Sequence, residues 1–226
     1  MSSDVPQARR DPRGLSSDVP QARRVSKPAP ALLDLLTRPA DEVAPLLLGA
    51  HLTGRGVTVR LTEVEAYLGE ADPGSHAFRG LTPRTRTMFG EPGHLYVYFS
   101  YGMHVCANVV CSPEGTASAV LLRAGEVVDG LELARERRPT AKTDAELARG
   151  PAHLTKALGI ELADDTAALG GAPFTLEPPP HPTPFATGPR VGVSGDGGTD
   201  AFPLRFWIPG DPTVSVYRAH TPKKHR

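Results

Sequence analysis

The chain has 226 residues and a mass of 24.0 kDa, the size of one globular domain with an additional arm. Its 25 Lys and Arg residues balance 25 Asp and Glu residues, which excludes a general electrostatic attraction to nucleic acid or membranes. Two cysteines exclude a disulfide-dense secreted scaffold and a four-cysteine zinc site, and no apolar run approaches the roughly 20 residues of a membrane span, so we expect a cytoplasmic protein.

The first thirty residues differ from the rest of the chain. The segment SSDVPQARR at 2–10 is repeated without change at 16–24, and residues 1–30 hold six Lys or Arg against three Asp. With few large apolar side chains, such a segment does not offset the entropy of ordering, so we expect a disordered basic arm. It is either an arm that contacts phosphates or a neutral tail. We expect one domain over 31–217 and a basic tail over 218–226.

The next elements are predicted from hydrophobic patterns. Leucine-rich residues 31–48 predict two short helices, with Asp41 capping the second and Gly49 ending it. Residues 57–67 alternate in polarity and predict a strand. One face of this strand would carry Val57, Val59, Leu61, Glu63, Glu65 and Tyr67.

The remaining segments complete a mixed pattern. Residues 95–111 predict strands broken at Gly102, and residues 119–123 predict a third short strand. Acidic residues 126–165 predict helices, Pro-rich residues 171–189 a loop, and residues 190–217 short strands. Because no regular strand–helix–strand rhythm occurs, a doubly wound sheet is excluded and the fold class is α+β.

The two glutamates in the 57–67 strand are the first candidates for chemistry. Glu63 and Glu65 are two residues apart, so their side chains point the same way, about 6.5 Å apart. If that face points inward, both acids lie at a core or pocket, where an ionised carboxylate needs a partner. The same pattern also fits an exposed strand end with ordinary surface charges, and alternation alone does not decide between the two.

An aromatic segment near three arginines is the second candidate. Residues 95–104 hold three of the five tyrosines. Together with Arg79, Arg84 and Arg86 they suit stacking on nucleobases beside phosphate contacts. A packed aromatic strand pair beside a solvated loop is the alternative. The histidines show no metal-ligand spacing, so no metal is expected.

Several segments together resemble the alkyladenine (3-methyladenine) DNA glycosylase family. The resemblance is carried by TEVEAYLGEADPGSHAFRGLTPRTRTMF at 62–89, PGHLYVYFSYGMHVCANVV at 92–110 and VLLRAGEV at 120–127. It extends through GPAHLTKALGI at 150–160 and PLRFWIPGDPTVS at 203–215. It implies a single domain around a curved antiparallel sheet with flanking helices.

The resemblance also implies an activity. Such an enzyme hydrolyses the bond between a damaged purine and its deoxyribose, leaves an abasic site, and has no lyase step. Its substrates would be alkylated, deaminated or etheno purines in double-stranded DNA. No cofactor is implied. We expect a monomer, associated with the nucleoid if the source is a bacterium.

The family's functional residues map onto this chain one by one. Glu65 matches the general base and Arg123 the arginine near the attacking water. Tyr101 matches the tyrosine that is wedged into the minor groove. The residues that match the base pocket are Tyr67, His76, Tyr98 and Asn108.

Some positions depart from the family or lack a role in it. Glu63 has no assigned role in the family. We expect it to hold neighbouring residues of the site in place. The family often has Gly and Lys where this chain has Ala152 and His153, which would weaken contact with the DNA backbone. Two other functions stay open: a damaged-DNA or RNA binding module without turnover, and a hydrolase of free N-glycosides.

Overall fold

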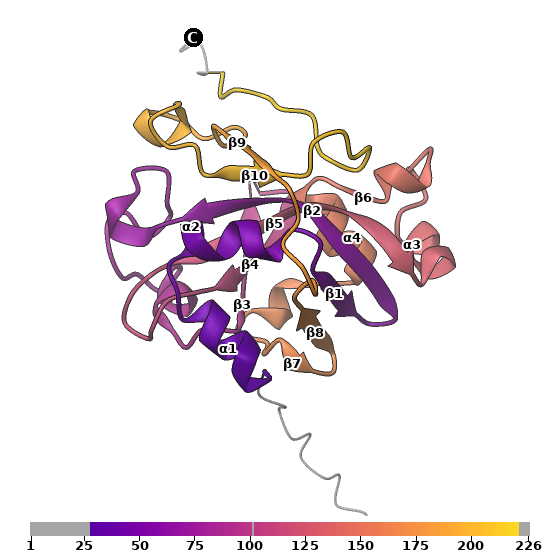
Figure 1. The fold of residues 1–226 in the computed structure, drawn as a ribbon, viewed down its shortest axis with the longest axis horizontal. Coiled ribbons are helices and arrows are strands. Elements are labelled where there is room, and N and C mark those ends of the chain that lie inside the picture. The colour runs from indigo at the N-terminus through magenta and orange to yellow at the C-terminus, as the bar shows by residue number, and fades with distance from the viewer. Residues whose placement is uncertain (1–27, 101, 222–226) are drawn as a thin grey trace, which may run out of the picture.

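The structure is a computed structural model that describes residues 28–100 and 102–221. Within these residues, ten strands form one sheet, and all the strand pairs are antiparallel. The main strand order is β3-β4-β5-β2-β1-β8-β7, with β10 on β2, β9 on β10, and β6 on β5. The sheet curls, as Figure 1 shows, so the expected α+β fold with a curved antiparallel sheet and flanking helices is confirmed.

The strands vary widely in length. The two longest, β2 and β5, lie side by side and form the middle of the sheet. The strands are β1 (His51–Gly54), β2 (Val57–Tyr67), β3 (Leu95–Ser100), β4 (His104–Val110), β5 (Ala119–Asp129), β6 (Ala148–Arg149), β7 (Gly170–Gly171), β8 (Phe174–Glu177), β9 (Ala186–Gly188) and β10 (Arg205–Trp207).

The helices are short and lie around the sheet (Figure 1). The α-helices are α1 (Pro30–Leu36), α2 (Ala40–Val43), α3 (Leu131–Arg137) and α4 (Pro151–Leu158). The 3₁₀-helices are η1 (Ala44–Leu47), η2 (Gly69–Ala71), η3 (Arg86–Phe89), η4 (Asp144–Glu146), η5 (Leu162–Asp164) and η6 (Asp196–Gly198). No helix of the described residues is long and apolar enough to cross a membrane.

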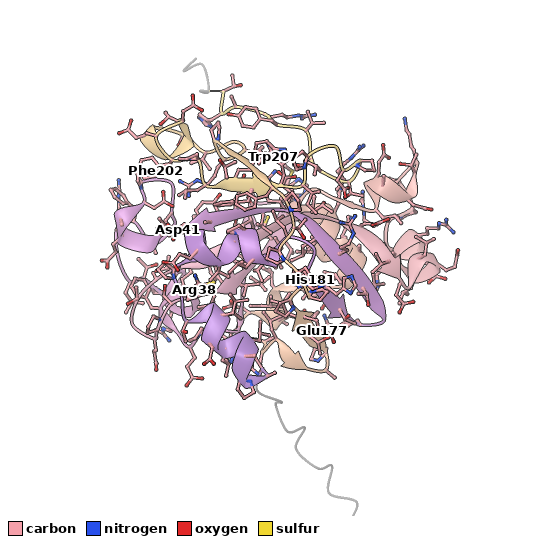
Figure 2. All side chains as sticks on the ribbon, viewed as in Figure 1. Arg38, Asp41, Glu177, His181, Phe202 and Trp207 are labelled. Atoms are coloured by element: carbon pink, nitrogen blue, oxygen red, sulfur yellow. The ribbon has the colours of Figure 1, made fainter. Side chains whose placement is uncertain are left out.

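The N-terminal helices differ from the prediction in one detail. Pro39 occupies the N-cap of α2, so the expectation that Asp41 caps this helix is wrong. Asp41 lies instead in the first turn, near the positive end of the helix dipole (Figure 2). The helical segment then continues as η1, and Gly49 follows it with φ +85°.

Three segment predictions differ from the structure. The strand expected at 119–123 continues to Asp129, because its second half also pairs with β2. In that half Glu126 and Asp129 are exposed and polar, so the apolar pattern stops before the strand does. The Pro-rich segment 171–189 was expected to be a loop, yet it contains β8 and β9. Both are short strands between prolines, a length at which the alternation of polarity gives little signal. Of the strands expected over 190–217, only β10 forms.

A change of register in β2 decides which of its residues face the core. Val57, Val59 and Leu61 belong to the main hydrophobic core, and beyond them the core residues are Val64 and Ala66. The pairing with β5 is irregular between Leu61 and Val64. A β-bulge inserts an extra residue and shifts the alternation by one. The prediction that the glutamates share a face with Val57, Val59 and Leu61 is therefore wrong.

Candidate active site

A cavity of about 460 Å³ opens beside the second half of β2. Six of the residues predicted for catalysis or base binding line it together: Glu65, Tyr67, His76, Tyr98, Asn108 and Arg123. They come from β2, β3, β4, β5 and the loop after η2, so the sheet brings together residues up to 58 positions apart, from 65 to 123. The volume lies in the usual range for small-molecule sites, about 300–1,000 Å³.

Glu65 is a fully buried carboxylate, 0% exposed, in the wall of this cavity. Its Oε1 accepts a hydrogen bond from the backbone N–H of Val191 at 2.7 Å and lies 3.3 Å from Nη1 of Arg123. Its Oε2 accepts a hydrogen bond from the Tyr67 hydroxyl at 2.9 Å. Burial by itself raises the pKa of Tyr67, and the nearby Glu65 charge raises it further, so the phenol stays protonated and donates.

Arg123 lies between the two glutamates. Its Nε donates to Glu63 at 2.8 Å, while Nη1 faces Glu65. Burial alone would lower the pKa of this guanidinium, but Glu65 and Glu63 raise it above its usual range. The site therefore holds a permanent cation next to the Glu65 carboxylate.

Glu63 is also 0% exposed but does not line the cavity. It accepts hydrogen bonds from Arg123, from Nε of Arg205 at 2.7 Å and from the Ser215 backbone N–H at 2.7 Å. Burial alone would raise the pKa of Glu63, yet Arg123 and Arg205 lower it. Both glutamates are thus buried, and the interpretation as surface charges is wrong.

The aromatic side of the cavity is built from His76 and two tyrosines of β3. The His76 ring meets Tyr98 edge-on at 4.6 Å between centroids, and Tyr96 stacks with Tyr98 at 5.4 Å. Asn108 donates its side-chain N–H to the Tyr96 carbonyl at 3.1 Å, which fixes the orientation of the amide. The pocket therefore offers aromatic surfaces beside a fixed polar group, an arrangement that accepts a planar heterocycle.

The arginines of the 79–86 loop do not act as one group. Arg84 lines the cavity, and its guanidinium lies 5.6 Å from the Tyr98 ring centroid. Arg79 and Arg86 are exposed and do not line it. Tyr101 lies outside the described residues, so its predicted role as a wedge stays a prediction.

Some cavity residues were not predicted from the sequence. Met88, Tyr96 and Cys106 line the cavity, and so does the segment 191–194. Val191 contributes only its backbone N–H, so its residue type could not have indicated a role. Tyr96 belongs to the tyrosine-rich segment 95–104, but no role was predicted for it individually. Cys106 and Cys111 are both free. Among the described residues, no group of His, Cys, Asp or Glu is arranged to hold a metal ion.

The surroundings of His76 make stability depend on pH. His76 as a whole residue is exposed, yet desolvation of its ring in the cavity wall and the neighbouring Arg84 lower its pKa from 6.5 to about 4. Between these values the unfolded chain binds more protons than the folded one, so the free energy of unfolding falls as the pH decreases. We expect His76→Gln to lessen this decrease between pH 7.5 and 5, measured by urea unfolding at both values. The control is His220→Gln, since His220 does not line the cavity. An unchanged decrease in His76→Gln would contradict this assignment.

Comparison with known proteins gives a consistent result. The family model for Methylpurine-DNA glycosylase (MPG) matches residues 34–212. The chain is 60% identical over 193 residues to a protein of Leifsonia xyli, covering 81% of this chain and 90% of that protein. It is 55% identical over 206 residues to a protein of Streptomyces avermitilis, covering 87% and 96%. Both relatives are named "Putative 3-methyladenine DNA glycosylase".

Proposed function

Since the chain belongs to the methylpurine-DNA glycosylase family, we propose that it hydrolyses the N-glycosidic bond of damaged purines in double-stranded DNA and leaves an abasic site. The observation that carries this proposal is a buried carboxylate, Glu65, in the wall of an aromatic cavity with an arginine 3.3 Å away. A base inside a duplex does not reach such a cavity, so the damaged nucleotide must flip out of the stack, at a cost of a few kcal/mol.

In the proposed reaction Glu65 acts as the general base. It takes a proton from water as the water oxygen forms a bond to C1′ of the deoxyribose. The bond from C1′ to the purine nitrogen breaks, and its electron pair leaves with the base. The sugar gains oxocarbenium character, which a nearby carboxylate stabilises. Arg123 keeps a positive charge 3.3 Å from the Glu65 carboxylate.

The aromatic residues account for binding of the flipped base. Tyr67, His76 and Tyr98 present rings to the cavity, and aromatic faces attract cationic alkylated purines. Because the pKa of His76 is lowered to about 4, this ring is neutral near pH 7 and does not repel such cations. Asn108, held by the Tyr96 carbonyl, would crowd the 2-amino group of normal guanine.

No lysine lines the cavity formed by the described residues, so a Schiff-base nucleophile is missing from it. We therefore propose a monofunctional enzyme without a strand-cleaving lyase step. We also propose that it acts as a cytoplasmic monomer. Hypoxanthine and ethenoadenine are proposed as substrates beside methylated purines.

The test uses labelled duplex oligonucleotides with one ethenoadenine, hypoxanthine or 7-methylguanine, incubated with the wild type and then treated with or without alkali. Strand breaks that appear only after alkali are the expected result. Breaks without alkali would contradict the monofunctional mechanism. Release from free deoxyinosine but not from any duplex would favour a hydrolase of free N-glycosides. Lesion binding without release from any of the duplexes or from alkylated DNA would favour a binding module.

We also propose, from the sequence match alone, that Tyr101 fills the gap left by the flipped nucleotide. An inserted side chain offsets the lost stacking, so its removal should weaken the flipped complex specifically. We expect Tyr101→Ser to weaken binding to the ethenoadenine duplex about tenfold, from a stacking contribution of ~1–3 kcal/mol, and binding to undamaged duplex much less. Fluorescence anisotropy with both duplexes measures this, and an equal loss on both would contradict the wedge role.

A further inference from the structure

Arg190 is a buried arginine that does not line the cavity. It is 1% exposed, and its Nη1 and Nη2 bind the two carboxylate oxygens of Asp72 at 2.5 and 2.6 Å. It also donates to the carbonyls of Ala66 at 2.9 Å and Gly197 at 2.8 Å. One guanidinium therefore ties together β2, the turn after η2 and the segment 190–197.

Two of the three groups that contact the Glu65 carboxylate lie next to this arginine. The Val191 N–H that donates to Glu65 at 2.7 Å belongs to the peptide plane that begins at Arg190. The Tyr67 ring, whose hydroxyl donates to the other oxygen of Glu65, lies 4.5 Å from the Arg190 guanidinium. The third group, Arg123, is held separately by Glu63.

The surroundings leave little room for a different arrangement. A Cβ added at Gly74 would clash with Nη2 of Arg190, and one added at Gly197 would clash with the backbone of Gly74. An apolar side chain in place of Arg190 would fill the space but would donate no hydrogen bond to the Ala66 and Gly197 carbonyls. Buried ion pairs are often replaceable without loss of stability, so packing alone does not require an arginine here.

We propose that Arg190, held by Asp72, is a positioning residue that fixes the Val191 N–H and the Tyr67 hydroxyl on the two oxygens of Glu65. This inference rests on the proposed function of Glu65 as the general base. Without Arg190, the Glu65 carboxylate loses its fixed orientation toward the attacking water. Misplacement of a reacting group by about 1 Å costs about 100-fold in rate.

The test compares folded variants. Arg190→Met combined with Asp72→Asn removes both charges, because loss of one partner alone leaves a buried charge unpaired. Arg190→Lys is the second variant: its single ammonium keeps the charge but does not bridge Asp72 and both carbonyls. Single-turnover rates are measured on whichever of the ethenoadenine, hypoxanthine and 7-methylguanine duplexes the wild type cleaves fastest. Affinity is measured in a Glu65→Gln background, and folding by urea unfolding.

The control is Arg55→Met with Asp164→Asn, a pair of the same bidentate geometry in which Arg55 is exposed. Arg55 also binds both carboxylate oxygens of its partner, at 2.8 and 2.7 Å, and lies 4.9 Å from the Phe174 ring, but neither member of the pair lines the cavity. We expect the Arg190 and Asp72 double variant to lose about 10- to 100-fold in rate with affinity changed less than about threefold. The control should keep its rate within about twofold.

The outcomes separate this inference from the proposed function. If the wild type cleaves none of the duplexes and releases no methylated purine from alkylated DNA, the proposed function fails and the inference fails with it. If the wild type is active and the folded double variant keeps its rate, Arg190 has no positioning role. Should the double variant fail to fold, Arg190→Lys decides: a rate loss with unchanged affinity supports the inference, and a wild-type rate overturns it. An equal rate loss in the control also overturns it.

Discussion

Glu65→Gln will lower the single-turnover rate of base release by about 10²- to 10⁴-fold while the affinity for the lesion duplex stays within about threefold. Glutamine has the shape of glutamate and still accepts the Val191 N–H, but it takes no proton from water and carries no charge to stabilise the developing oxocarbenium ion. The measurement is release of ethenoadenine, hypoxanthine or 7-methylguanine from a labelled duplex under enzyme excess, followed by alkali.

The control for this prediction is Glu126→Gln. Glu126 is an exposed carboxylate of the neighbouring strand β5, paired with Arg60 and away from the cavity. Its replacement should leave the rate within about twofold of the wild type, since exposed ion pairs contribute little. A Glu65→Gln enzyme that releases the base at the wild-type rate would remove Glu65 from the mechanism. A loss of binding equal to the loss of rate would assign Glu65 to base recognition instead.

Arg123→Met will lower both stability and rate. Arg123 is 6% exposed and faces Glu63 and Glu65, which are both 0% exposed. Its removal therefore leaves two buried carboxylates without their cation. Breaking a buried pair in this way costs about 3–5 kcal/mol of unfolding free energy. The loss of a preorganised cation at the reacting centre should also lower the rate by about 10²-fold. Urea unfolding and single-turnover kinetics measure the two effects separately.

Arg38→Met is the matched control for the stability effect. Arg38 pairs with Glu42 at 2.9 Å, but both side chains are about half exposed, 49% and 51%. Such a pair contributes less than about 1 kcal/mol, so the unfolding free energy should change little. If Arg123→Met and Arg38→Met lose the same small amount of stability, the two buried glutamates do not depend on Arg123, and the arrangement described for the site is wrong.

The sequence predicted much of the fold because local patterns act over short distances. Alternation of apolar residues placed β2, and the strands predicted over 95–111 with a break at Gly102 form as β3 and β4. Gly102 adopts φ +66° at the turn, a conformation that costs glycine little. The EAYLG and LLRA motifs were sufficient to indicate Glu65 and Arg123, since motif identity does not depend on knowing where the side chains point.

Only the tertiary structure decided how the site is held together. Because β2 pairs irregularly with β5, the residues of β2 that face the core change from 57, 59 and 61 to 64 and 66. The sequence of one strand does not show how it pairs with another. The hydrogen bond from Val191 to Glu65 joins residues 126 positions apart through a backbone N–H that every residue except proline has. The Arg190–Asp72 pair likewise spans 118 positions. Residue types determine which groups are present, but chain folding determines which of them meet.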